Sequence, residues 1–311
     1  MHYKSLHLML IFFTKRSKAA CGVSHSNSLV PKYWRKMIVR FWMDRAVRLM
    51  PALILVVVAG TAAKYVANDT RGLFSHAVRA LCSLENTTFF RNGRNSPFEH
   101  TWSLACEEQF YLFWCLTLPY LATCSNRMRG YIVFTLFATS FFSRWYSASH
   151  LVFSFFQWNR GLGSVGFKML FGASFRLVPF PRTLTRAWAS RFGLFLIAIA
   201  ALSPLTLVGK DKTKVLTLLF DCMACVGAAL VITSSLKHQS AILSLAPLSF
   251  LGRISYAGYL WPTMIILVNK SMYKGYPAVT DTALGLLFAT ASTFWMEEPL
   301  RRRYRTLMNG S

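Results

Sequence analysis

The sequence predicts an all-α protein: a polytopic transmembrane helix bundle of about eight spans, with both termini in the cytoplasm. Three observations support this fold class. Apolar residues make up 54% of the 311-residue chain, and the mean hydropathy is +0.38. They gather in long runs, and the basic residues lie between those runs. A single soluble core of this size could not bury so much apolar surface, so we expect an integral, multi-pass membrane protein.

Eight apolar runs come close to the length of about 20 residues that a helix needs to cross a bilayer. They are Leu49–Ala67, Thr101–Cys124, Tyr131–Val152, Gly161–Val178, Phe192–Gly209, Val215–Leu236, Phe250–Val268 and Ala278–Met296. Arg144 interrupts the third run and Arg253 the seventh, so the ends of these two spans are the least defined.

The basic residues set the predicted orientation. Lysines and arginines outnumber acidic residues 35 to 11, which could indicate a nucleic-acid partner. Here they flank the apolar runs, as in membrane proteins, so we expect membrane lipid and no nucleic acid as a partner. The segment before the first span is basic, and basic loops recur at every second connection: Arg127 and Arg129; Arg176, Arg182, Arg186 and Arg191; Lys237 and Arg253; Arg301, Arg302, Arg303 and Arg305. These loops are therefore placed in the cytoplasm.

The opposite loops contain sequons at Asn68, Asn86 and Asn269, which would face the exterior or a lumen. Three lysines between positions 210 and 214 fall on the outer side, against the rule. The expected organisation is a basic cytoplasmic segment with a remnant of an apolar span (1–48), a membrane domain (49–296) and a basic cytoplasmic tail (297–311). Cys222 and Cys225 form a CxxC inside an apolar run, which favours packing over a metal or redox site.

The second predicted span carries the residues that could take part in a chemical reaction. Ser96-Pro97-Phe98-Glu99 has the pattern of a capping box, which predicts a helix start. Glu107 and Glu108 then enter the membrane, where each charged carboxylate facing lipid would cost at least about 2.5 kcal/mol. We therefore expect both to face the bundle interior or a wet cavity.

Helical periodicity places six residues of this span on one face: His100, Ser103, Leu104, Glu107, Tyr111 and Trp114. His100 and Glu107 would lie about 10.5 Å apart along the axis, which suits two groups on either side of a substrate. The imidazole could take a hydroxyl proton, and the carboxylate could orient its partner. Alternatively, the glutamates with Gln109 bond neighbouring helices and His100 lies in interfacial water. Arg160 could pair with a carboxylate in either case.

The run His100-Thr101-Trp102-Ser103-Leu104-Ala105-Cys106-Glu107-Glu108-Gln109-Phe110-Tyr111-Leu112 resembles the signature of the acyltransferase 3 family of membrane O-acyltransferases. Weaker similarities follow at Arg45–Pro51, Asn159-Arg160 with Gly172, Leu251–Trp261 and Glu297–Leu300. Together they cover residues 41–305. The resemblance implies transfer of an acyl group, often acetyl from acetyl-CoA, to a carbohydrate or glycolipid hydroxyl.

The expected site combines the residues with this resemblance. Glu107 and His100 are the catalytic candidates, and Trp102, Glu108, Arg160 and Tyr111 are the substrate-binding candidates. Arg45 and Arg48 share a helical face, where guanidinium groups could hold the phosphates of the acyl-CoA donor. Alternatively, these arginines are topological anchors and Trp102 is an interfacial aromatic. No bound cofactor and no metal are expected.

Two departures from the family pattern matter. The family resembled here has about ten spans and a catalytic histidine in the first, about eleven residues after a basic residue; no such arrangement is present before Leu49. Pro262 also follows Trp261, where the family commonly has a histidine. Three explanations for these departures are open: the chain is a fragment, its gene start is misplaced, or it is an inactive relative of the family. A transporter or flippase-like protein is the alternative outside enzymology, although no inverted repeat is visible.

Overall fold

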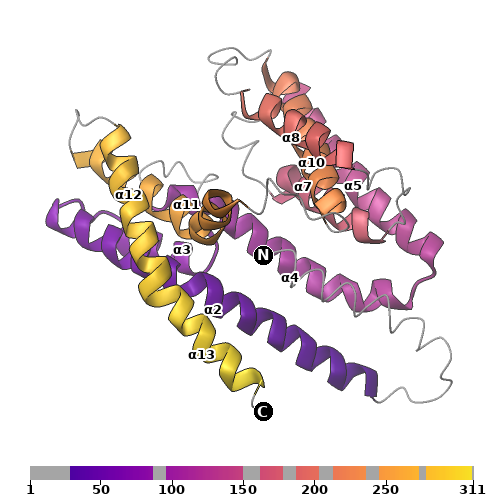
Figure 1. The fold of residues 1–311 in the computed structure, drawn as a ribbon, viewed down its shortest axis with the longest axis horizontal. Coiled ribbons are helices and arrows are strands. Elements are labelled where there is room, and N and C mark those ends of the chain that lie inside the picture. The colour runs from indigo at the N-terminus through magenta and orange to yellow at the C-terminus, as the bar shows by residue number, and fades with distance from the viewer. Residues whose placement is uncertain are drawn as a thin grey trace. The chain divides into compact units, whose positions relative to one another are not determined.

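The computed structural model describes residues 29–86, 96–149, 162–177, 187–202, 213–235, 245–272 and 278–309. All regular elements within these ranges are helical, which confirms the all-α prediction. In chain order they are α2 (Leu29–Val66), α3 (Leu73–Leu81), the 3₁₀ turn η2 (Glu99–Thr101), α4 (Trp102–Thr123), α5 (Asn126–Ser149), α7 (Leu162–Leu177), α8 (Ala187–Ala201), α10 (Thr213–Ser235), α11 (Ala246–Met272), α12 (Ala278–Ser292), the π turn η4 (Thr293–Glu297) and α13 (Glu298–Asn309) (Figure 1).

Each of the eight predicted spans overlaps one α-helix. Among the described residues, two helices are long and apolar enough to cross a membrane: Ile38–Val66 within α2 and Leu216–Ser235 within α10. Trp188–Ala201 in α8 is apolar but shorter. The total number of spans and the location of the termini stay predictions.

The first helix begins earlier than the predicted first span. Apolar runs alone mark Leu49 as its start, whereas α2 extends back to Leu29 through the basic segment. Lysine, arginine and methionine are good helix formers, so the charged stretch continues the helix toward its N-terminal end. The predicted remnant of a span before residue 29 lies outside the described residues. At the other end, α12, η4 and α13 follow one another without a break, through the predicted tail boundary at position 297.

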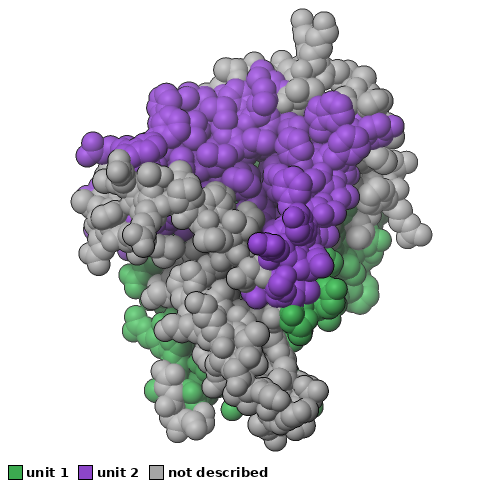
Figure 2. Space-filling model, turned by 90° about the vertical axis from the view of Figure 1, so that its right-hand side faces the viewer, with its two compact units in different colours: residues 1–123, 250–311 green, residues 124–249 purple. Residues whose placement is uncertain are grey.

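The chain divides into two compact units (Figure 2). The first unit combines Met1–Thr123 with Phe250–Ser311, and the second consists of Cys124–Ser249. In the first unit, α2, α11 and α12 share a core with Phe98. Its most buried members include Ala52, Leu53, Val56, Phe98, Ala257, Leu260 and Ala289.

A glycine permits the close contact between α11 and α12. A Cβ atom built on Gly285 would lie 2.4 Å from Cα and 2.6 Å from N of Pro262. Any side chain there would force the two helices apart, because the nearest atoms belong to the backbone. Gly285 thus brings α12 against Pro262, the residue that stands where the family commonly has a histidine.

In the second unit, α8 and α10 cross at a pair of glycines. A Cβ atom on Gly193 would lie 2.6 Å from the Gly227 carbonyl oxygen, and the converse distance is also 2.6 Å. Small residues of this kind let helix backbones approach closely. Cys222 and Cys225 on α10 are free and half-buried. Within the described ranges, no three His, Cys, Asp or Glu side chains are grouped so as to hold a metal ion.

Candidate active site

Arg45 joins α2 to α4, the helix that carries the paired carboxylates. Its Nη2 donates to Oε1 of Glu108 at 2.6 Å, and its Nε donates to the same carboxylate at 3.1 and 3.3 Å. The guanidinium lies 4.0 Å from the centre of the Tyr111 ring. Arginine suits this arrangement because its planar fork can meet a carboxylate and stack on an aromatic face together. Arg45 is buried, so these contacts hold α2 against α4.

Glu107 and Glu108 are neighbours in the chain but lie in different environments. The Glu108 side chain is 16% exposed, whereas that of Glu107 is 42% exposed and its Oε2 lies 3.7 Å from Arg45 Nη2. Successive residues of a helix point in different directions. The Arg45 guanidinium therefore bonds the Glu108 carboxylate directly, whereas the Glu107 carboxylate makes only the longer contact. Glu107 is therefore the more accessible carboxylate, and Glu108 the more firmly held.

His100 lies in the 3₁₀ turn η2, before the α-helix begins at Trp102. The expected stacking of His100 above Glu107 assumed a continuous α-helix, which this turn interrupts. Both ring nitrogens of His100 are buried, and among the described residues neither makes a well-formed hydrogen bond, although the Leu260 backbone lies close to the ring. The ring packs against Tyr259 with a centroid distance of 5.8 Å. Buried polar atoms without a partner are uncommon in native proteins, and a catalytic role is one of their explanations.

The capping box expected at Ser96 and Glu99 is replaced by another arrangement. Ser96 Oγ accepts a bond from the Phe98 N–H at 3.2 Å and donates to the buried carboxylate of Glu85. The Glu99 N–H donates to the Ser96 carbonyl at 3.2 Å, as in a turn. The serine hydroxyl thus satisfies a buried acid in preference to the helix end.

The chain before this turn is attached to α4 beside the glutamate pair. The side-chain amides of Asn86 and Gln109 exchange two hydrogen bonds of 2.9 Å, and Gln109 Nε2 also donates to the Ser83 carbonyl at 3.1 Å. Asn86 Nδ2 lies 3.6 Å from Cys106 Sγ. The Asn86 side chain is buried and bonded to Gln109, so it is not exposed for a glycan in this structure, and the side of the membrane on which this loop lies stays a prediction.

Glu85 and His76 face each other in the same region, with 3.7 Å between Oε1 and Nδ1. Burial raises the pKa of the Glu85 carboxyl, although the Ser96 bond acts in the opposite direction. Burial also lowers the pKa of the His76 imidazole, and Arg79 adds to this effect. Both shifts favour the uncharged forms, so this contact is not a strong ion pair.

Two residues outside the predicted site hold His100 in place. The Tyr259 hydroxyl on α11 donates to the His100 carbonyl, and Ser103 Oγ lies 2.8 Å from the same hydroxyl. Periodicity had placed Ser103 on the His100 face. Tyr259 could not be connected to His100 from the sequence, because the two are 159 residues apart.

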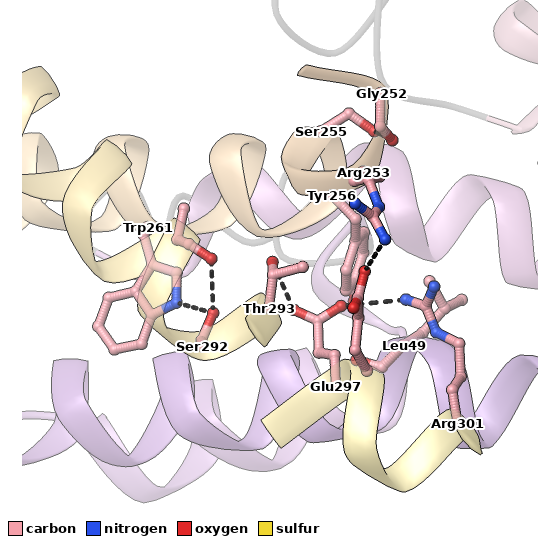
Figure 3. A network of polar contacts seen from close by, with 12 residues as sticks. Leu49, Gly252, Arg253, Ser255, Tyr256, Trp261, Ser292, Thr293, Glu297 and Arg301 are labelled. Carbon is pink, nitrogen blue, oxygen red and sulfur yellow. Dashed lines mark hydrogen bonds and ion pairs between the residues drawn. The ribbon is translucent and has the colours of Figure 1, made fainter. Parts of the chain in front are cut away.

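Glu297, the last residue of η4, is buried within a polar network that includes residues of α11, η4 and α13 (Figure 3). Thr293 Oγ1 and Arg301 Nη2 donate to its two oxygens at 3.3 and 3.2 Å. Nearby, the Tyr256 hydroxyl donates to the Leu49 carbonyl at 3.1 Å. The Tyr256 bond joins α11 to α2, whereas the bonds of Glu297 join η4 to α13, so Glu297 has a structural role within the first unit.

The remaining site candidates are distributed as follows. Arg48 lines a pocket with arginines of α11 and α13. Tyr111 lies beneath Arg45, and Trp102 is the first residue of α4, partly buried. Arg160 lies outside the described residues. The structure therefore brings Arg45, Glu107, Glu108 and Tyr111 together and places His100 against α11.

Residues 26–297 match the acyltransferase domain that defines the acyltransferase 3 family. O-acetyltransferase OatA of Staphylococcus aureus (strain NCTC 8325 / PS 47) is 26% identical over 315 residues, which cover 91% of this chain and 51% of that protein. A protein of S. aureus strain COL that is named a putative O-acetyltransferase is 25% identical over 309 residues, which cover 84% of this chain and 47% of that protein.

The chain spans about half the length of the curated relatives it matches. No solved structure matches it. The domain match covers most of the chain, includes the glutamate pair and extends to Glu297. On this basis the chain belongs to the acyltransferase 3 family.

Proposed function

We propose that this protein is a membrane-bound O-acyltransferase that moves an acyl group, in the first instance acetyl, from acyl-CoA to a carbohydrate or glycolipid hydroxyl. One observation carries the proposal: Arg45 fixes Glu108 and leaves the adjacent Glu107 accessible on the same helix. A structural ion pair alone would need only one carboxylate. Family membership and the names of the relatives support the same reaction class.

In the proposed reaction, the acceptor hydroxyl oxygen attacks the thioester carbonyl carbon, so a C–O bond forms and the C–S bond breaks. The imidazole of His100 takes the hydroxyl proton, which then passes to the departing thiolate of CoA. Glu107 orients the acceptor by accepting a hydrogen bond from it. Trp102 and Tyr111 complete the proposed acceptor site, and Glu108 supports it through Arg45. The acceptor-binding role expected for Arg160 from the sequence stays a prediction.

We further propose that the eight apolar segments all cross the membrane and that both termini face the cytoplasm. The support is the overlap of each segment with a helix, together with the basic loops at every second connection. In this orientation Arg45 and Arg48 lie within α2, just before the first predicted span and on its cytoplasmic side. The donor would then approach from the cytoplasm.

The test is acyl transfer by the protein reconstituted in liposomes, with radiolabelled acetyl-CoA and a choice of oligosaccharides and extracted membrane glycolipids. An O-acetyl product would retain the label until mild alkali releases it as acetate. His100→Ala should abolish product formation if the imidazole is the base, while His76→Ala, which removes a histidine on α3, should not. Absence of labelled product with every acceptor class, from folded protein, would refute the proposal.

A transporter or flippase-like function is the second candidate, and a charge cluster in the second unit favours it. Asp221 on α10 accepts from Lys168 Nζ at 2.6 Å and also pairs with the buried Arg144. Ionisable residues in a helix able to span the membrane often mark a substrate or ion path. Under this hypothesis, liposomes would move fluorescent glycolipid between leaflets without acyl-CoA, and Asp221→Asn would stop the movement. An inactive relative would show neither activity.

A further inference from the structure

Five arginines line one pocket in the first unit, and they come from three helices. The pocket has a volume of about 140 Å³. Its arginines are Arg48 of α2, Arg253 of α11, and Arg301, Arg302 and Arg305 of α13. The remaining lining residues are Glu298 and Gly252. The sequence had assigned the α13 arginines to membrane topology only, so this convergence is a feature of the tertiary structure.

The carboxylates near this pocket do not balance its positive charge. Glu298 pairs with Arg253 at 3.1 Å and with Arg302 at 3.4 Å, and Glu297 pairs with Arg301 at 3.2 Å. Within the described part of the chain, no carboxylate lies within ion-pair distance of Arg48 or Arg305. Nε of Arg48 and Nε of Arg301 are buried and have no hydrogen-bond partner among the residues that the structure describes. The pocket thus has both excess positive charge and N–H donors to offer to an anion.

We propose that this arginine pocket binds a phosphate-bearing ligand, and that the ligand is the phosphate groups of the acyl-CoA donor. Guanidinium groups bind phosphate through forked, charge-assisted hydrogen bonds. The identity of the donor rests on the proposed function, whereas the phosphate chemistry rests on the pocket itself. Arg48 then keeps the donor-binding role expected for it, with α11 and α13 supplying the other ligands, while Arg45 is engaged by Glu108.

An anionic lipid headgroup carries the same phosphate chemistry, but the arrangement of the arginines favours a discrete ligand. If the arginines of α13 were attracted only to a charged lipid surface, each exposed arginine of this helix would contribute to binding to a similar extent. Arg303 is exposed on the same helix, yet it does not line the pocket. Gly252 leaves the wall open, because a Cβ atom built there meets nothing within 4 Å. The concave shape therefore distinguishes Arg305 from Arg303.

The experiment measures binding of coenzyme A to the full chain in nanodiscs of neutral phosphatidylcholine, by isothermal titration calorimetry. Arg305→Ala should raise the Kd at least tenfold. Arg303→Ala is the matched control, since it removes the same charge from the same helix, and its Kd should stay within twofold. Equal losses in the two variants would indicate general electrostatic attraction and overturn the pocket assignment.

A second variant blocks the pocket without changing its charge. Gly252→Phe should weaken coenzyme A binding as much as Arg305→Ala, because the new ring would occupy the open wall. Gly130→Phe, at a glycine that also has open space around it in the second unit, should have no effect. Unchanged binding in Gly252→Phe, with its folding verified by thermal unfolding, would contradict the proposal.

Nanodiscs that contain phosphatidylglycerol separate the two sources of phosphate. If that lipid raises the Tm of the wild type and of Arg303→Ala but not of Arg305→Ala, and coenzyme A does not bind, the pocket holds a lipid headgroup and the donor assignment is overturned. Binding requires no turnover, so the outcome is independent of the transfer assay. Specific coenzyme A binding without acyl product would support this pocket and count against the proposed enzyme.

Discussion

Arg45 on α2 and Glu108 on α4 form a forked ion pair, with 2.6 Å between Nη2 and Oε1, although 63 residues separate them in the chain. Glu108 lies in the run where the family resemblance is strongest, and Arg45 begins the weaker similarity at Arg45–Pro51. The pair is largely withdrawn from solvent and is covered by the Tyr111 ring. It fixes the position of α4, and with it the direction in which Glu107 points.

The first prediction concerns the stability of this pair. Arg45→Ala leaves Glu108 partly buried without its cation, and removing one partner of a buried ion pair typically costs about 3–5 kcal/mol. We expect a clear loss of unfolding free energy, measured by chemical denaturation in detergent micelles. Arg45→Lys should recover only part of it, because an ammonium cannot form the fork.

The same variant also separates a structural role from donor binding. If Arg45 acts through Glu108, the loss of unfolding free energy in the double variant Arg45→Ala, Glu108→Ala should be much smaller than the sum of the losses in the two single variants. A raised KM for acyl-CoA in Arg45→Ala, with unchanged stability, would instead favour direct binding of the donor phosphates.

The second prediction contrasts the two carboxylates. Glu107→Gln keeps the size and the hydrogen-bonding capacity of the side chain but removes its charge, so turnover should fall at least tenfold, about 1.4 kcal/mol of barrier. Glu108→Gln should mainly lower stability, since it weakens the bond to Arg45. Acyl transfer and thermal unfolding are measured for both variants. Full activity of Glu107→Gln would remove Glu107 from the site.

The third prediction concerns the contact between α11 and α12. Gly285→Ala places a methyl group against the Pro262 backbone, and overpacking of this kind costs about 1–3 kcal/mol. The Tm should fall. Gly258→Ala on α11 is the matched control, because its added methyl group would lie 3.8 Å from the nearest atom, Cδ2 of Leu286. A similar Tm for the two variants would mean that the helices can separate at little cost.

The fourth prediction tests the orientation of the chain through a natural probe. Cys82 lies just after α3 and is exposed, whereas the other cysteines in the described ranges are buried or half-buried. If residues 68–99 face the exterior, an impermeant maleimide added to intact cells should label Cys82. Cys82→Ser should remove this labelling, in a background of Cys21→Ser because Cys21 lies outside the described residues. Labelling that requires permeabilised cells would reverse the orientation.

The sequence alone predicted the all-α fold class, the location of a helix at each of the eight apolar runs, and the position of the glutamate pair on one of these helices. These features follow from local properties: hydrophobic length, helical period and charge between runs. The family resemblance at His100–Leu112, and its extension toward Glu297, could also be recognised from the order of residues.

Only the tertiary structure decided which charges meet. Arg45 and Arg48 lie on one helical face, yet Arg45 binds Glu108 and Arg48 lines a pocket with arginines from α11 and α13. Helical periodicity also could not predict that Asn86 is buried, that His100 lies in a 3₁₀ turn, or that the His100 ring packs against Tyr259. The physical reason is that hydrophobic patterning specifies which face of a helix is buried, whereas pairing between polar groups depends on which helices lie next to one another.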